Sequence, residues 1–160
     1  MFAGGFTLEA AEEVCGDEGA EPAGVLESLS RLVDQSLVIS EDRGQARFRM
    51  LETLRRYAGE RLGESGTAEK LQRRHADCFL RLAERAEPML RGPQQATWLR
   101  ALESDRDNFS AAMDWAFRRD PDVAVRLTSA LAYFWLIGRR RSEVRQRLAE
   151  AVDMARGTAG

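Results

Sequence analysis

The chain has 160 residues, of which 44% are hydrophobic and 31% are charged. This composition is typical of a folded globular domain and excludes an intrinsically disordered chain. The net charge of −2 excludes a general attraction to nucleic acid or to an anionic membrane surface.

Two helices are predicted near the start of the chain. Thr7 is a favourable N-cap residue, and apolar side chains follow it at helical spacing as far as Gly16. A polar turn then leads to Pro22, a good first residue for a second helix that ends near Gln35. The second helix has an apolar stripe with the 3.6-residue period, made up of Val25, Leu26, Leu29, Leu32 and Val33.

A β-hairpin and a third helix are predicted next. Residues 36–40 are rich in β-branched side chains, and residues 46–51 alternate apolar with charged side chains. The intervening residues 41–45 have the composition of a turn. Helical spacing then returns over residues 52–63.

The alternation in the second hairpin strand predicts which side chains are buried. We expect Phe48 and Met50 to face inward and Arg47 and Arg49 to face outward, because successive side chains of a strand point to opposite faces. The order helix, helix, hairpin, helix is that of a winged helix. The fold class is therefore expected to be mainly α with one small β-hairpin, beginning with a winged-helix-like module over residues 1–64.

The second half of the chain is predicted to be almost entirely helical. The apolar periodicity predicts helices over 68–90, 94–118, 121–137 and about 144–152. Long helices separated by short breaks favour antiparallel hairpins, and the spacing of Val144, Leu148 and Ala151 matches one helix of a tetratricopeptide unit.

These patterns divide the remainder of the chain into two parts. We expect a connecting helix over residues 65–92 and an arm of tetratricopeptide-like helical hairpins over residues 93–160. Such repeats need about three copies for stability, so we expect the arm to be truncated.

Nothing in the sequence predicts catalysis. The stretch Gly63–Lys70 lacks the second glycine of a phosphate-binding loop and follows no strand. His75 has no metal-ligand spacing around it and no nucleophile motif to activate. We expect no enzyme activity, no catalytic residue, no metal and no cofactor.

Targeting signals are also missing from the sequence. Residues 1–6 lack the basic and apolar regions of a signal peptide, and the longest apolar stretch, 127–137, is roughly half of a membrane span. Cys15 and Cys78 have no CxxC spacing, as is typical of reduced cytosolic thiols. We expect a cytoplasmic protein with no membrane partner.

The distribution of charge argues against DNA as a partner. Residues 1–64 contain 7 Arg and Lys against 13 Asp and Glu, a net charge of −6, which leaves +4 for the rest of the chain. The helix that would read a DNA groove presents Glu27, Arg31 and Asp34 beside its apolar stripe, and a surplus of acids repels phosphate. Direct DNA binding through the winged helix is therefore the alternative and not the main hypothesis.

Two groups of arginines are candidate interaction surfaces. The first consists of Arg47, Arg49, Glu52, Arg55 and Arg56, around the junction of the hairpin and the third helix. We interpret it as an interdomain or partner surface. The second is a basic interaction patch, Arg139, Arg140, Arg141 and Arg145.

Several stretches of the chain resemble a known family. They are FAGGFTLEAAE at 2–12, LVDQSLV at 32–38 and RFRMLETLRRYA at 47–58, followed by shorter matches such as LAYFW at 131–135. The chain resembles the region after the nucleotide-binding domain in actinobacterial transcriptional regulators of the signal-transduction ATPase type (LuxR/AfsR-like). The resemblance covers essentially the whole chain.

The resemblance implies a position inside a larger regulator. In that family the winged helix packs on the ATPase core, and the helical arm senses or recruits a partner. Related ATPases often carry a Met-His-Asp triplet where this chain has Met50-Leu51-Glu52. The aliphatic Leu51 cannot donate a hydrogen bond to a phosphate, which argues against direct nucleotide sensing.

The resulting hypothesis is a non-enzymatic regulatory module that binds a protein. The partner would be a nucleotide-binding domain on another chain or in a missing part of the same chain. A further alternative is a fragment that completes an ATPase in trans. We also expect a homodimer if the aromatic side chains of the arm are exposed, namely Trp98, Trp115, Phe134 and Trp135.

Overall fold

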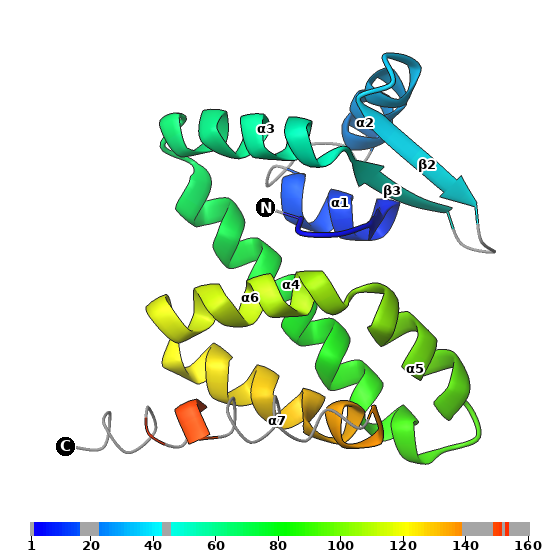
Figure 1. The fold of residues 1–160 in the computed structure, drawn as a ribbon, viewed down its shortest axis with the longest axis vertical. Helices are drawn as coiled ribbons and strands as arrows, with labels where there is room; N and C mark the ends of the chain where they lie inside the picture. Colours follow the sequence, from blue (N-terminus) through cyan, green and yellow to red (C-terminus); the bar gives the residue numbers. More distant parts are fainter. Residues whose placement is uncertain (1, 17–22, 43–45, 139–148, 152, 154–160) are drawn as a thin grey trace. The chain divides into compact units, whose positions relative to one another are not determined.

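The protein is mainly α-helical with one small three-stranded antiparallel sheet, which confirms the predicted fold class (Figure 1). The computed structural model describes residues 2–16, 23–42, 46–138, 149–151 and 153. The chain divides into two compact units, Met1–Cys78 and Phe79–Gly160.

The first unit contains the sheet. Its described elements are β1 (Phe6–Thr7), α1 (Leu8–Cys15), α2 (Ala23–Asp34), β2 (Val38–Asp42), β3 (Ala46–Met50), α3 (Glu52–Glu64) and the beginning of α4 (Ala68–Ala86). The strand order is β1-β3-β2, so β3 is the central strand. The predicted hairpin is confirmed, with Val38 opposite Met50.

The strand β1 was not predicted. It pairs antiparallel with β3 through Phe6 opposite Phe48, but two residues are too few to show an alternating pattern. Thr7 ends this strand and is also the N-cap of α1, because its side-chain oxygen accepts a hydrogen bond from the Ala10 N–H at 3.2 Å. The predicted helix start is therefore confirmed.

The core of the first unit lies between the sheet and the helices α1 and α2. Its buried side chains are Phe6, Ala11, Leu29 and Val38. Phe48 and Met50 pack against this cluster, as the alternation predicted, and Arg49 is exposed. The apolar stripe of α2 is confirmed except at Leu26, whose side chain is exposed.

Helix α3 packs less closely than the other helices of the first unit. None of its side chains is buried. It ends at Ser65, and the chain turns into α4 at Gly66, whose φ of +74° is a conformation that glycine adopts readily. The side chain of Arg74 in α4 donates a hydrogen bond of 2.8 Å to the carbonyl oxygen of Glu13 in α1, which fixes α4 to the core of the unit.

The second unit is helical throughout its described part. It contains the end of α4, the 3₁₀ helix η1 (Glu87–Arg91), α5 (Gln95–Ser104), α6 (Arg106–Arg119) and α7 (Pro121–Ile137). Figure 1 shows α6 and α7 side by side and antiparallel. The turn between them is set by Asp120, whose carboxylate accepts a hydrogen bond from the Val123 N–H at 3.2 Å, and by Pro121 in the first turn of α7.

Two predicted helices were wrong in extent. The helix predicted over 68–90 ends at Ala86 and continues as η1, because Pro88 has no N–H to donate within an α-helix. The helix predicted over 94–118 is two helices, since Asp105 leaves helical geometry with φ −105° and ψ 12°. The helix predicted over 144–152 lies largely outside the described residues.

The large aromatic side chains of the arm are mostly buried. Trp115, Phe134 and Trp135 are 4–7% exposed, and Trp98 is partly covered by the Arg85 guanidinium, 5.9 Å from its ring centroid. The expectation that these rings would form an exposed patch was therefore wrong for three of the four. The prediction of a homodimer loses that support.

Candidate partner surface and apolar groove

The partner surface predicted from the sequence is defined by Arg47, Arg49, Glu52, Arg55 and Arg56. The structure places it on β3 and on the first five residues of α3, two elements that are separated by a single residue, Leu51. These five side chains differ in the contacts that they make. Arg47 is half-buried and donates a hydrogen bond of 2.9 Å to the carbonyl oxygen of Gly5, so it holds the chain before β1 against β3.

Two of the remaining arginines on this surface are neutralised by acids. Arg49 lies 3.3 Å from the carboxylate of Glu41 on the neighbouring strand. The guanidinium of Arg55 donates hydrogen bonds of 2.6, 2.8 and 3.0 Å to the Glu52 carboxylate. The hydrogen bond from Arg55 lowers the pKa of Glu52, and the charge of Arg56 lowers it further.

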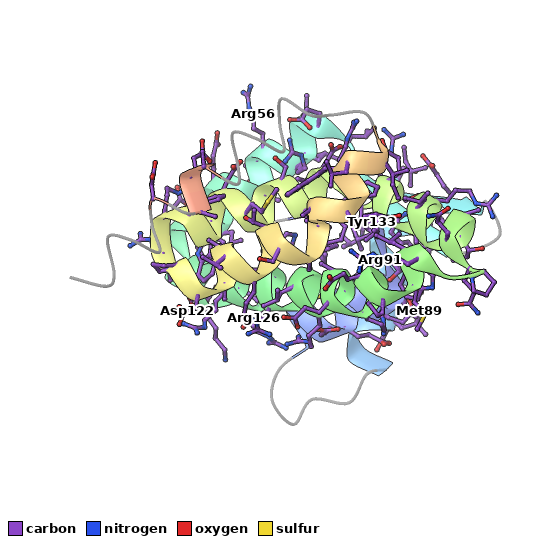
Figure 2. The ribbon with its side chains drawn as sticks, turned by 90° about the horizontal axis from the view of Figure 1, so that it is seen from below. Arg56, Met89, Arg91, Asp122, Arg126 and Tyr133 are labelled. Carbon is purple, nitrogen blue, oxygen red and sulfur yellow. The ribbon has the colours of Figure 1, made fainter. Side chains whose placement is uncertain are left out.

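Arg56 is the side chain on this surface that is most available for a partner. It is exposed, and within the described part of the chain it has no ion pair or hydrogen bond. Figure 2 shows its side chain extending away from the ribbon. An uncompensated guanidinium can bind a carboxylate or phosphate of a partner through two parallel hydrogen bonds.

Large apolar side chains are exposed beside this surface. Ile39 is 37% exposed and lies directly opposite Arg49 in the β2–β3 ladder. Leu51 and Tyr57 are 44% and 56% exposed. A mixture of arginine, tyrosine and aliphatic side chains is typical of the central part of a protein–protein interface.

Arg31 and Ser28 on the outer face of α2 contact groups of their own helix. Its arginine, Arg31, forms an ion pair of 2.5 Å with Glu27 one turn earlier. The hydroxyl of Ser28 donates to the Gly24 carbonyl oxygen at 2.8 Å, so it is turned toward its own helix. The pairing of Arg31 with Glu27 reduces the positive charge that α2 presents to a partner.

Sequence reasoning missed an apolar groove within the first unit. It has a volume of about 330 Å³ and lies between α3 with the start of α4 and the core formed by α1, α2 and the sheet. The α3 side of the groove is formed by Arg55, Ala58, Gly59 and Leu62, and Leu71 of α4 completes it.

The opposite wall of the groove is formed by the core. Its apolar residues are Phe2, Phe6, Ala11, Val25, Leu29, Leu32, Val38 and Met50. The polar side chains that line it are Arg55, Ser28 and Cys15. Burial raises the pKa of the Cys15 thiol, and the positive charge of Arg74 offsets only part of this shift. The thiol is therefore protonated at neutral pH.

The only histidine of the sequence lies in the first unit, where its ring is buried against an aromatic side chain. His75 is 3% exposed, and its ring meets that of Phe2 edge-on with 5.4 Å between centroids. Among the described residues, no group of three or more His, Cys, Asp and Glu side chains could hold a metal ion. Across all the residues that the structure describes, in both units, no helix is long and apolar enough to cross a bilayer.

Two arginines of the second unit, Arg91 and Arg126, contact partners within that unit. Figure 2 shows Arg91 beside Tyr133, with 4.7 Å between the guanidinium carbon and the ring centroid. Arg126 of α7 lies 2.7 Å from the Glu84 carboxylate. The predicted basic patch of Arg139, Arg140, Arg141 and Arg145 lies outside the described residues.

Comparisons with known proteins connect the chain to transcriptional regulators. It is 39% identical over 137 residues to a Mycobacterium tuberculosis protein named "Putative HTH-type transcriptional regulator Rv0890c", and equally to "Putative HTH-type transcriptional regulator Mb0914c" of Mycobacterium bovis. These matches cover 84% of this chain but 15% of each relative. The names support the coarser part of the prediction, a relationship to transcriptional regulators.

A second relative has no functional name. The chain is 42% identical over 77 residues to "Uncharacterized protein Rv0894" of Mycobacterium tuberculosis, a match that covers 47% of this chain and 20% of the relative. No protein-family model matches the chain, and no solved structure matches it. The chain spans less than a quarter of the length of these relatives.

Proposed function

We propose that the chain is a non-enzymatic regulatory module that binds a protein partner through the partner surface. The partner we infer is a nucleotide-binding domain, on another chain or elsewhere in a longer chain of the ATPase type. The observation that carries the proposal is the exposed Arg56 on α3, together with the exposed side chains of Leu51, just before this helix, and of Tyr57, the next residue in sequence. The names of the mycobacterial relatives support the regulatory part.

The composition of this surface favours a protein over a nucleic acid. Arg49 and Arg55 are paired with the carboxylates of Glu41 and Glu52 and supply little net positive charge. Arg47 keeps its charge, but it is half-buried and held against the carbonyl oxygen of Gly5. Binding to a phosphate backbone depends on the number of uncompensated cations. A protein partner with an acidic side chain opposite Arg56 and an apolar pocket for Leu51 or Tyr57 fits the surface better.

The replacement Arg56→Glu tests the proposed surface. We expect it to weaken binding to a nucleotide-binding domain encoded in the same or the adjacent reading frame by at least about tenfold, since it turns an attraction into a repulsion. Fluorescence anisotropy of the labelled domain titrated with this chain measures the effect. Arg56 touches no described side chain through an ion pair or hydrogen bond, so the fold is expected to persist.

The matched control is Arg31→Glu. It makes the same charge change on an exposed residue of α2, outside the partner surface, and we expect it to leave the affinity within about twofold. Equal weakening by both variants would indicate a general charge effect and not a specific surface. An affinity unchanged by Arg56→Glu would overturn the proposed surface.

Direct DNA binding is the second candidate, and the printed names of the mycobacterial relatives favour it. We expect a gel-shift assay of this chain with random duplex DNA at about 50 mM salt to show no shift, because Arg31 of α2 is already paired with an acid. A shift that disappears when the salt is raised to about 200 mM would establish phosphate contacts and reverse this ranking.

A further inference from the structure

The apolar groove of the first unit is not used by the proposed function. Its volume of about 330 Å³ lies at the lower end of the range of about 300–1,000 Å³ for small-molecule sites. An engineered apolar cavity of about 150 Å³ binds benzene. The groove is therefore large enough for a molecule of about two rings, or for a branched acyl group of similar size.

The polar groups of the groove define the charge of such a molecule. Among the described lining residues, Arg55 has the charged side chain, and its charge is paired with the Glu52 carboxylate through three hydrogen bonds. The Ser28 hydroxyl donates to the backbone, and the raised pKa keeps the Cys15 thiol uncharged at neutral pH. Among the residues that the structure describes, none of the lining side chains offers an uncompensated charge to a charged ligand.

The packing of α3 explains why the groove exists. The helix turns Ala58, Gly59 and Leu62 toward the core, yet none of its side chains is buried. At Gly59 an added Cβ would meet no other atom within 4 Å. The missing side chain leaves space that the neighbouring helices do not fill.

We propose that this groove is a binding site for a neutral, apolar small molecule of about two rings. The bound molecule would fill the gap between α3 and the core and make van der Waals contacts with both walls of the groove. The exposed residues of the partner surface lie on the same helix α3 and on the strand before it. Occupancy therefore provides a physical route by which a small molecule could regulate partner binding.

The test uses the fluorescent ketone 6-propionyl-2-(dimethylamino)naphthalene as the probe. It is neutral at pH 7, has a two-ring aromatic system, and becomes brighter in an apolar environment. We expect saturable binding to the intact chain and a decrease in the rate of Cys15 alkylation by iodoacetamide, since Cys15 lines the groove. Mass spectrometry distinguishes Cys15 from Cys78, which is buried.

Two leucine substitutions provide a matched pair. Gly59→Leu fills the groove, whereas Gly63→Leu places the same side chain one turn later on α3, where the position does not line the groove and has open space. Both remove a helical glycine, so neither is expected to destabilise α3. We expect Gly59→Leu to weaken probe binding at least about tenfold and Gly63→Leu to leave it within about twofold.

The outcomes separate this site from other apolar surfaces. Probe binding that survives Gly59→Leu, or that fails to protect Cys15, would place the probe elsewhere and overturn the proposal. Absence of saturable binding to the intact chain would overturn it as well. The result is independent of the partner surface, because the probe assay needs no partner and Arg56→Glu leaves the groove unchanged.

Discussion

Replacing Asn108 by aspartate is expected to lower the free energy of unfolding of the second unit by about 3–5 kcal/mol at pH 7. Asn108 is 0% exposed, and its amide nitrogen donates a hydrogen bond of 3.2 Å to the carboxylate of Asp105. N108D replaces this donor by a second carboxylate in a buried site. Two buried carboxylates at hydrogen-bonding distance repel each other and have lost their hydration.

The loss of stability in N108D is expected to depend on pH. Burial and the neighbouring carboxylate raise the pKa of the introduced carboxyl in the folded state above its value of about 3.9 in the unfolded chain. A group with a raised folded pKa destabilises as the pH rises above its unfolded pKa, and the penalty is complete above its folded pKa. We therefore expect the variant to be closest to wild type near pH 4 and furthest from it near pH 7.

Urea unfolding followed by tryptophan fluorescence measures this effect in the relevant unit, because the three tryptophans of the sequence, Trp98, Trp115 and Trp135, all belong to the second unit. S104D is the control, since it adds the same charge on the other side of Asp105 at an exposed position. The control is expected to change stability by less than about 0.5 kcal/mol. Equal unfolding midpoints for the two variants would contradict the buried arrangement.

The break at Asp105 also shows where sequence patterns fail. Residues 94–118 contain no glycine or proline, so neither of the strong helix breakers interrupts the helical period. At the break, Asp105 and Asn108 form a buried hydrogen-bonded pair, and this burial is a property of the assembled unit. Where a local signal exists, as with Asp120 and Pro121 before α7, the helix start was predicted correctly.

The hairpin was predictable for the same reason. Arg47, Phe48, Arg49 and Met50 alternate between charged and apolar side chains, and alternation determines which side faces the core. The strand β1 has only Phe6 and Thr7, and its pairing with β3 joins residues 40 and 42 positions apart. Such a short strand is stabilised by its pairing with β3. Its two residues are too few to show an alternating sequence pattern.

The candidate surfaces were predictable to different degrees. The partner surface was identified because charged residues are visible in a sequence, but the pairing of Arg49 with Glu41 and the contact of Arg47 with Gly5 depend on the fold. The groove was missed because Ala58 and Leu62 have the spacing of an ordinary core-facing stripe. Spacing indicates which face of α3 turns inward, but it does not indicate how closely that face packs.

Replacing Phe109 by alanine is expected to lower the free energy of unfolding of the second unit by about 3–5 kcal/mol. Phe109 is 2% exposed on α6. Its ring meets that of Phe79 edge-on, with an interplanar angle of 80° and 5.5 Å between centroids. Three terms add up to this loss of stability: the lost burial of the ring, the cost of the cavity left behind and the lost aromatic contact. The aromatic contact alone contributes about 0.5–1.5 kcal/mol.

A loss of this size is a large part of the total stability of a small domain, about 5–15 kcal/mol. Tryptophan fluorescence in urea again measures the second unit, and L136A is the control because Leu136 is 53% exposed at the end of α7. The double variant F79A/F109A isolates the contact between the rings. We expect it to lose less stability than the sum of the two single variants, by about 0.5–1.5 kcal/mol. Strict additivity would contradict the edge-on contact, while a small effect of F109A alone would contradict the close packing of α6 in this core.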